Sequence, residues 1–385
     1  MIYLDYNATT SVHPEVRRAI NEFLDLEYGN PSSTHAKGRV AKAAVDAARA
    51  SVAAAVGATT PDEIVFTGSA TEANNLAVIG ACHAAAANCK HLIVSAVEHP
   101  AVIEPALQLQ HQGWKLSIAP VDHEGRVNLQ ALAVLLDSAP TALVSVMHAN
   151  NELGTIQPVV EIGALVKRHG ALFHVDAAQS LGKVQVDVNA MAADLLTIAG
   201  HKMYAPKGIG ALYVRRGTPL QPLVFGASQE RGVRPGTENV AYIAGLGAAA
   251  RIVTSNPAKV REMARLRDQL QARLLGGIPG LVVNGSEGSR LPNTLHVSLP
   301  VGSARAIVAL LADQVAISPG AACHADHPDE PSGVMKAIGA TAQQANGALR
   351  LSLGYDTTAE EIEQASRLVV AAFERHVADI ESGRR

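Results

Sequence analysis

Short β-branched runs alternate with helical patterns through the middle of this 385-residue sequence, and this alternation limits the fold most. Six runs are predicted to be strands, at 63–67, 91–95, 141–147, 171–175, 194–198 and 210–214. Because strands that alternate with helices form crossover units, the order predicts a mainly parallel sheet with helices on both faces. Ligands of such sheets gather at the carboxyl ends of the strands.

The pattern changes beyond about residue 250. There we predict a charged helix at 260–275 and a strand at 294–299. A helix that starts at Ser303 and a final helix at 358–376 follow. A chain of this length also exceeds the size at which one core usually stops growing. We therefore expect a large domain of 14–250 and a smaller α+β domain made of 1–13 and 251–385.

The composition argues against several kinds of function. The net charge of −3 gives no basic field for nucleic acid or an anionic membrane. No apolar run approaches the ~20 residues that a membrane span needs. Three cysteines, Cys82, Cys89 and Cys323, are too few for a disulfide framework and are odd in number. We therefore expect a cytoplasmic protein that acts on small molecules and binds neither nucleic acid nor membranes.

Two predicted strands end close to a carboxylate and a lysine. Asp176 follows the strand at 171–175, and Lys202 follows the strand at 194–198. Both are groups that pyridoxal 5′-phosphate (PLP) needs: a carboxylate beside its pyridine nitrogen keeps that nitrogen protonated, and a lysine can hold the cofactor as a Schiff base. Either residue alone is more often a solvated side chain at a strand end, so the prediction depends on the whole set.

Three further strand ends carry groups that suit the same cofactor. The turn 67–72 follows a strand and opens a helix, so its backbone N–H groups and the Thr71 hydroxyl can bind a phosphate. A capped helix without a ligand is the alternative. His99 can stack on the pyridine ring or be an ordinary loop histidine, and the segment 148–152 offers an amide to the ring's phenolic oxygen.

Together these motifs resemble the cysteine desulfurase and selenocysteine lyase branch of the class-V aminotransferase-like, fold-type I PLP enzymes. The resemblance runs from end to end, through Tyr3-Leu4-Asp5-Tyr6-Asn7-Ala8-Thr9-Thr10, Gly29-Asn30-Pro31-Ser32-Ser33, Arg234-Pro235-Gly236-Thr237-Glu238-Asn239 and Arg350-Leu351-Ser352-Leu353-Gly354. It implies an α/β fold-type I transferase, whose large domain has a mainly parallel, seven-stranded sheet beside a smaller α+β domain. It also implies a homodimer.

The resemblance implies roles for individual residues. Lys202 would carry PLP, Asp176 would pair with the ring nitrogen, and His99 would stack on the ring at the catalytic centre. The other expected contacts are Asn151 and Gln179 to the ring oxygen, Ala70, Thr71 and His201 to the phosphate, Thr237 to the same phosphate from across a dimer interface, and Asn7 and Arg350 to the substrate. Arg350 would bind the substrate carboxylate in the bidentate way that a guanidinium allows.

One cysteine lies in a sequence typical of a loop. Cys323 stands among small residues, just before a polar stretch with two prolines. The resemblance makes it the active-site thiol, whereas Cys82 and Cys89 are expected to be small buried hydrophobes in a helix. A thiolate at 323 would take sulfur from L-cysteine as a persulfide and leave L-alanine. With L-selenocysteine, selenium leaves more readily, Cys323 would mainly manage a proton, and the product is again alanine.

Two features favour selenium. The loop Gly320-Ala321-Ala322-Cys323-His324-Ala325-Asp326-His327 resembles that of the lyases, whereas housekeeping desulfurases commonly read Ser-Gly-Ser-Ala-Cys-Thr. Ala199 stands where those desulfurases have a phosphate-binding serine. We therefore predict a lyase that removes selenium, and also sulfur, from the amino acid and passes it to an acceptor protein. Bacterial desulfurases with the lyase-like loop also exist, so a cysteine desulfurase that serves iron–sulfur cluster assembly or tRNA thiolation is the alternative.

Other interpretations are weaker. Thiol, imidazole and carboxylate groups, all of which can bind zinc, occur together at Cys323, His324, Asp326, His327 and Asp329. Adjacent ligands in a loop rarely reach tetrahedral geometry, however, and a metal would quench the thiol. We therefore expect no metal. His324 or His327 can instead tune the thiol. An ordinary aminotransferase would need no thiol, and a non-catalytic PLP-binding scaffold would not need the complete set of cofactor contacts. One departure from the family is Tyr355, which stands where an arginine is usual.

Overall fold

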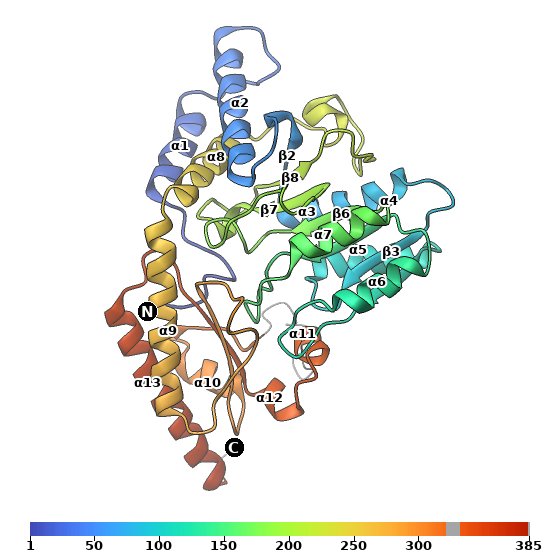
Figure 1. The fold of residues 1–385 in the computed structure, drawn as a ribbon. Coiled ribbons are helices and arrows are strands. Elements are labelled where there is room, and N and C mark those ends of the chain that lie inside the picture. The colour runs from blue at the N-terminus through green and yellow to red at the C-terminus, as the bar shows by residue number, and fades with distance from the viewer. Residues whose placement is uncertain (321–331, 384–385) are drawn as a thin grey trace.

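The computed structural model describes residues 1–320 and 332–383. Its larger sheet lies in the upper half of Figure 1 and has seven strands. In spatial order they are β2 (Ile64–Thr67), β8 (Gly210–Val214), β7 (Leu195–Ala199), β6 (Leu172–Asp176), β5 (Leu143–Met147), β3 (His91–Ser95) and β4 (Lys115–Ala119). Only β8 runs antiparallel to its neighbours, so the prediction of a mainly parallel, seven-stranded sheet is confirmed.

The sequence missed one strand of this sheet, β4. The other six lie within two residues of their predicted bounds. β4 is an edge strand that contains a single β-branched residue, and Lys115 and Ile118 on it are exposed. Buried strands read as continuous apolar runs, whereas a solvent-facing edge strand does not, so the signal used for the others was absent here.

Both faces of the sheet are buried beneath helices. Side chains of successive strand residues point to opposite faces. On β3, Ile93 accordingly belongs to one apolar core cluster, and Leu92 and Val94 belong to another. The helices of the larger part are α1 (Pro14–Asp25), α2 (Ala36–Val56), α3 (Ala70–Asn75), α4 (Ala81–Ala84), α5 (Pro100–His111), α6 (Leu129–Asp137), α7 (Val159–Arg168) and α8 (Val240–Thr254). The short connections that follow the carboxyl ends of the parallel strands can therefore form a ligand-binding site.

The C-terminal third forms a second body, in the lower half of Figure 1. Its elements are α9 (Pro257–Gly277), β9 (Val282–Val283), β10 (Thr294–Ser298), α10 (Ala304–Leu311), β11 (Val315–Ala316), α11 (Gly333–Ala337), α12 (Ala342–Asn346), β12 (Ala348–Ser352) and α13 (Ala359–Glu381). β12, β10 and β9 form an antiparallel sheet. The predicted helices and the strand at 294–299 are present, and β12 was missed.

The first residues of the chain pack with this second body. β1 (Ile2–Tyr3) pairs with β11, and Ile2 and Leu4 are buried in the same apolar cluster as Leu270 of α9 and Leu349 of β12. The expected domain boundaries, after residues 13 and 250, remain a prediction that this packing supports.

One detail of the helical prediction is wrong. Cys82 is buried in α4, as expected, but the helix ends at Ala84 and Cys89 lies beyond it, half-buried at the rim of the core. An alanine-rich sequence favours helix but does not say where the helix stops, because packing decides that. Among the described residues, no helix is both long and apolar enough to cross a membrane.

Candidate active site

Five strand ends meet at one cavity. β2, β3, β5, β6 and β7 all end at the same edge of the sheet, and the residues that follow them surround a volume of about 370 Å³. This size lies within the range of small-molecule sites. Of the residues expected at the site, those that line the cavity are Asn7, Ala70, Thr71, His99, Asn151, Asp176, Gln179, His201, Lys202 and Arg350.

Asp176 is the last residue of β6 and is held in a fixed orientation. One carboxylate oxygen accepts a hydrogen bond from Asn74 Nδ2 of α3 at 2.7 Å, and the other accepts from the Ala178 backbone N–H at 2.9 Å. The side chain is only 4% exposed. Asn74 Oδ1 is also buried and has no hydrogen-bond partner among the described residues. Asn74 was missed from the sequence, because an asparagine inside a helix pattern gave no sign of its distant partner.

Lys202 closes a short turn, Gly200–Lys202, directly after β7. Its Nζ donates hydrogen bonds to the backbone carbonyl oxygens of Asn7 and Ala8, the latter at 2.8 Å. The N-terminal segment therefore lies against the lysine in the cavity wall, although 195 positions separate Asn7 from Lys202. This places a primary amine at the cavity wall.

The turn after β2 starts a helix that points at the cavity. Ser69 caps α3 by accepting from the Glu72 N–H at 3.1 Å, and Thr71 is exposed toward the cavity. Gly210 on β8 lets the two segments approach, because a Cβ there would lie 2.7 Å from the Ser69 carbonyl carbon. A helix start with exposed N–H groups and a hydroxyl is a suitable place for a phosphate.

His201 also lines the cavity. Its Nδ1 is 3.2 Å from Thr9 Oγ1. Burial, with the nearby Lys202, Lys207 and Lys183, lowers the pKa of His201 to about 4. The imidazole is therefore neutral at pH 7, and it can contact a phosphate as a hydrogen-bonding group but not as a cation.

His99 and Glu98 follow β3 and have different environments. His99 caps α5, since its Nδ1 accepts from the Ala101 N–H at 3.1 Å, and its ring lines the cavity. Glu98 is buried, and its Oε1 accepts from Ser95 Oγ and from the Met147 N–H at 2.7 Å. Burial raises the pKa of Glu98 to about 8. Glu98 thus joins β3 to β5 beneath His99, a role that the sequence did not reveal.

The structure separates the two adjacent asparagines after β5. Asn150 is fully buried, where its Nδ2 donates to the Val97 carbonyl and its Oδ1 accepts from the Glu152 and Leu153 N–H groups. Asn150 therefore shapes the loop. Asn151, the one expected to contact the ring oxygen, is the one that lines the cavity.

Arg350 reaches the cavity from the second body. It lies on β12 and is 2% exposed. Its Nη2 donates to Asp5 Oδ1 at 2.8 Å, and its Nη1 donates to the Asn151 carbonyl at 3.1 Å. Arg350 Nε is buried without a hydrogen-bond partner in the described part of the chain. An arginine fixed in this way keeps donors for an incoming carboxylate.

One expected site residue does not line the cavity, and another cannot be compared with it. Thr237 is exposed on a loop and does not line it, although Arg234, three positions earlier, pairs with Glu72 of α3 at 2.8 Å. Cys323, together with the metal-type residues near it, lies outside the described residues.

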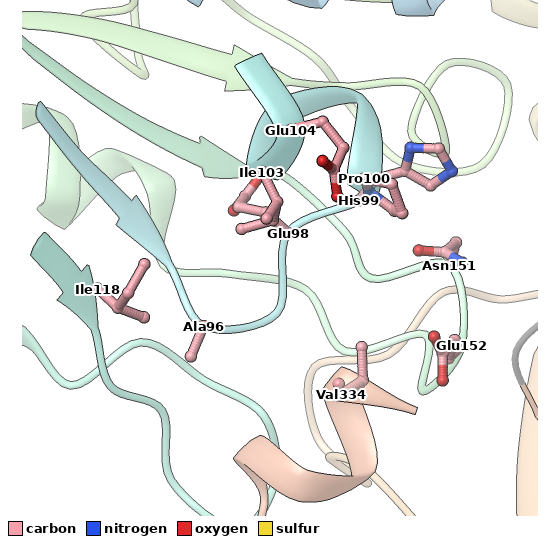
Figure 2. A pocket seen from close by; sticks show the side chains of 11 residues that line it. Ala96, Glu98, His99, Pro100, Ile103, Glu104, Ile118, Asn151, Glu152 and Val334 are labelled. Carbon is pink, nitrogen blue, oxygen red and sulfur yellow. The ribbon is translucent and has the colours of Figure 1, made fainter. Parts of the chain in front are cut away.

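A second cavity, of about 330 Å³, shares His99 and Asn151 with the first. Figure 2 shows Ile118 on one side of it, His99 and Asn151 on the other, and Val334 of α11 between them. Ser332, the first described residue after 331, donates to Glu152 Oε2 at 2.8 Å in this wall. The segment that follows the predicted thiol loop is therefore anchored next to the main cavity.

The class-V aminotransferase family profile matches residues 2–365. The chain belongs to the class-V aminotransferase family. It is therefore a PLP-dependent enzyme of fold type I, as the resemblance implied. The cavity fits this cofactor, since it combines a primary amine, a buried carboxylate with fixed hydrogen bonds, an imidazole and a helix start suited to phosphate.

Known members of the class-V family are similar along nearly the whole chain. The chain is 41% identical to "Cysteine desulfurase IscS" from Dictyoglomus turgidum, over 94% of this chain and 91% of that one. It is 44% identical to "Cysteine desulfurase" from Trichormus azollae, over 97% and 93%. Among solved structures, a "NifS-like protein" has a TM-score of 0.91 at 34% identity, with 97% of this chain and 99% of that chain covered. "SspA in complex with cysteine" has a TM-score of 0.81 at 33% identity, with 92% and 99% covered.

Proposed function

We propose that the protein is a PLP-dependent cysteine desulfurase, which takes sulfur from L-cysteine and releases L-alanine. The observation that carries the proposal is a single cavity that brings Lys202, Asp176 and Arg350 together. An amine for the cofactor, a carboxylate for its ring nitrogen and a guanidinium for a substrate carboxylate are the groups that amino-acid chemistry on PLP needs. The names of the relatives support sulfur as the atom removed.

In this proposal Lys202 would hold PLP, and Asp176, fixed by Asn74, would pair with the ring nitrogen. Of the other residues that line the cavity, His99 would cover the ring, Asn151 and Gln179 would contact the ring oxygen, and the turn at Ala70 and Thr71 would bind the phosphate together with His201. When bound, PLP withdraws electrons from the bonds to the substrate Cα. Lys202 is the group that can move a proton at that carbon, because its amine lies at the cavity wall.

Arg350 and Asn7 orient the substrate. Asp5 holds the guanidinium of Arg350, whose side chain lines the cavity and can there meet an incoming carboxylate. Asn7 Nδ2 donates to Thr294 Oγ1 at 2.8 Å and to the Asn151 carbonyl at 3.2 Å. A substrate carboxylate held there leaves its side chain free to meet the thiol.

In this proposal the sulfur is transferred to the thiol of Cys323. The thiolate of Cys323 attacks the substrate Sγ, so an S–S bond forms while the Cβ–Sγ bond breaks, and the electron pair goes to Cβ, which takes up a proton to become the methyl group of alanine. The persulfide then passes to an acceptor thiol, which we propose is carried by another protein. A cytoplasmic location would suit this chemistry, because thiols stay reduced there.

Selenocysteine is the second candidate substrate. The sequence favoured it through Ala199 and the loop around Cys323. Ala199 ends β7 and lines the cavity, so no hydroxyl stands at this position. The names of the relatives support the sulfur alternative, and the preference for selenium stays a prediction.

Alanine formation from L-cysteine and from L-selenocysteine, measured side by side under anaerobic reducing conditions, tests the proposed function. We expect turnover of L-cysteine, with a persulfide on Cys323 detected by mass spectrometry before an acceptor thiol is added. Ala199→Ser is the matched variant, and we expect it to change the relative kcat/KM of the two substrates. Alanine from selenocysteine alone, without a persulfide from cysteine, would contradict the desulfurase proposal and establish the lyase.

We also propose that the protein is a two-fold homodimer in which Thr237 binds the phosphate of the partner's site. Thr237 does not line the cavity of its own chain. Close to its loop, Val224 and Phe225 are 61% and 86% exposed, and Gly226 packs against Pro235. Exposed apolar side chains next to a functional segment are typical of an interface.

Mixed dimers test this arrangement. Thr237→Val is expected to lower cofactor affinity by about 10- to 100-fold, because a hydrogen bond to a charged group contributes about 1.5–3 kcal/mol. A Lys202→Ala chain, which cannot attach the cofactor but keeps Thr237, serves as the other subunit of the mixed dimer. When Thr237→Val and Lys202→Ala chains are mixed, each mixed dimer should regain one intact site with wild-type affinity. If Thr237 acted within its own chain, no mixture would regain it, and a fully active monomer in sedimentation would likewise rule the dimer out.

A further inference from the structure

Lys183 is a buried amine next to the cavity for which the proposed function gives no role. It follows β6 in the chain and is only 8% exposed. Its Nζ donates to Gln179 Oε1 at 2.6 Å and lies 3.4 Å from Asn7 Oδ1. Gln179 and Asn7 both line the cavity. Lys183 itself does not, so it lies one layer behind them.

The hydrogen bonds around Gln179 determine which way its amide points. Gln179 Nε2 donates to the Asn7 backbone carbonyl at 3.0 Å, and a carbonyl oxygen can only accept. The other end of the amide, Oε1, is therefore the atom that faces Lys183. Since Lys202 donates to the same Asn7 carbonyl, the Gln179 amide nitrogen lies on the Lys202 side of the cavity.

The charges around Lys183 argue against a role in holding the fold together. Of the described residues, no carboxylate lies within 4.0 Å of its Nζ. The charged groups that act on it are Lys202 and Arg350, and Arg350 is itself paired with Asp5. Burial, with these two cations, holds the pKa of Lys183 well below its usual range. A buried amine without a counter-ion lowers the free energy of unfolding. Lys183 is therefore better explained by a role at the site than by a role in stabilising the fold.

Tyr355, which replaces the usual arginine, secures the turn that carries Lys183. Its hydroxyl donates to the Gly182 carbonyl at 3.0 Å, and its ring stacks on Tyr204 with the centroids 4.4 Å apart. The residue before Lys183 is thus held from the side of the second body. A neutral phenol at this place also adds no further positive charge next to Lys183.

We infer that Lys183 is a positioning residue, which holds the Gln179 amide so that its nitrogen, and not its oxygen, is presented to the ring oxygen of the cofactor. The inference rests on the proposed cofactor site but not on the choice of substrate. Without Lys183, only the hydrogen bond from Nε2 to the Asn7 carbonyl would favour this orientation, so the amide would turn more easily and its oxygen would then repel the ring oxygen. A donor at the ring oxygen and a nearby cation both disfavour the protonated cofactor–lysine linkage. Loss of Lys183 should therefore raise the pKa of that linkage.

The visible absorbance of the bound cofactor, followed across pH in the holoenzyme, measures this pKa without any substrate. For Lys183→Met, which keeps most of the length of the side chain but removes its donor and its charge, we expect a rise of about one unit or more. Lys183→Gln, which keeps a donor, should restore part of the difference. Lys207→Met removes an exposed lysine that does not contact Gln179, and it should leave the pKa within about 0.3 unit of wild type.

A double variant separates positioning from a simple charge effect. If Lys183 acts through Gln179, adding Lys183→Met to Gln179→Leu should cause little further shift. Additive shifts, or no shift in Lys183→Met, would overturn the inference. If Lys183→Met does not retain the cofactor, the titration of Lys183→Gln decides in the same way. If the variants show the expected shifts in the pKa of the cofactor–lysine linkage but the enzyme does not act on cysteine, the inference stands and only the proposed function is refuted.

Thermal unfolding of the apoprotein gives a readout that an ordinary structural lysine would not give. Lys183 destabilises the fold fully at pH values below its lowered folded-state pKa. The effect fades as the pH rises from that pKa to 10.5, because in this range the unfolded chain binds more protons than the folded one. Lys183→Met should therefore be at least as stable as wild type at pH 7, with a smaller gain in stability at high pH. A large loss of stability at pH 7 would mean that Lys183 serves the fold.

Discussion

Lys202→Ala is expected to abolish covalent attachment of the cofactor and to reduce alanine formation by about 10³-fold or more. Lys202 places the amine at the wall of the cavity that also holds Asp176 and His99. Its removal takes away both the attachment point and the group that moves a proton at the substrate Cα, and proton transfer alone contributes about 10²–10⁴-fold. Borohydride reduction followed by peptide mapping measures attachment, and an alanine assay measures the rate.

Two neighbouring lysines make this experiment specific. Lys207 is exposed five positions along the chain, and Lys207→Ala should keep both the label and the rate. Lys183 is the other amine close to the cavity, bonded to Gln179. If wild-type protein carried the reduced label on Lys183 or another lysine, or if Lys202→Ala were still labelled to the same extent, the assignment of Lys202 would be refuted.

Cys323→Ala is expected to reduce alanine formation from L-cysteine by about 10³-fold or more while cofactor binding stays unchanged. Sulfur transfer needs a nucleophile at the substrate sulfur, and the loss of a catalytic nucleophile removes most of the rate. Cys323 lies outside the described residues, so this prediction comes from the sequence and from the proposed chemistry. The cofactor absorbance serves as the internal check that the site is intact.

The other cysteines provide controls for this variant. Burial raises the pKa of Cys82 to about 12, and Cys82 lies in the core, so it is a poor nucleophile. Cys89 is half-buried outside the helix, and Cys89→Ala should keep full activity and the persulfide on Cys323. An active Cys323→Ala enzyme, or a persulfide found on Cys89, would contradict the proposed role. With L-selenocysteine, strong loss in Cys323→Ala would show that the thiol is needed there too.

Much of the architecture could be predicted from the sequence, because it depends on local periodicity. Buried parallel strands read as continuous apolar runs, and six of the strands in the large sheet were found within two residues of their bounds. The residues that follow these strands were placed at one site because parallel strands end at a common edge. Asp176, Lys202, His99 and Thr71 all line the cavity, as that argument requires.

The sequence failed where the deciding contact is distant or the local signal is mixed. β4 is half-exposed. β12 is a short strand that pairs with β10, and at the centre of the pair His296 lies opposite Arg350, 54 positions later in the chain. Cys89 lies beyond the end of α4, because the alanine content that predicted the helix does not determine where it ends. No local pattern marked Asn74, whose partner Asp176 is 102 positions away.

The sequence by itself predicted the fold class and the cofactor, because these depend on residue types that follow predicted strands and on motifs shared with a known family. The roles of the individual site residues were implied by that resemblance and stay a proposal. Only the tertiary structure decided how the reactive groups are held. It placed Asn7 against Lys202, buried Arg350 against Asp5, and distinguished Asn151 from the structural Asn150. It also brought Lys183 behind Gln179, where hydrogen bonds fix the direction of an amide. Such arrangements arise from contacts between segments far apart in the chain, which no local pattern encodes.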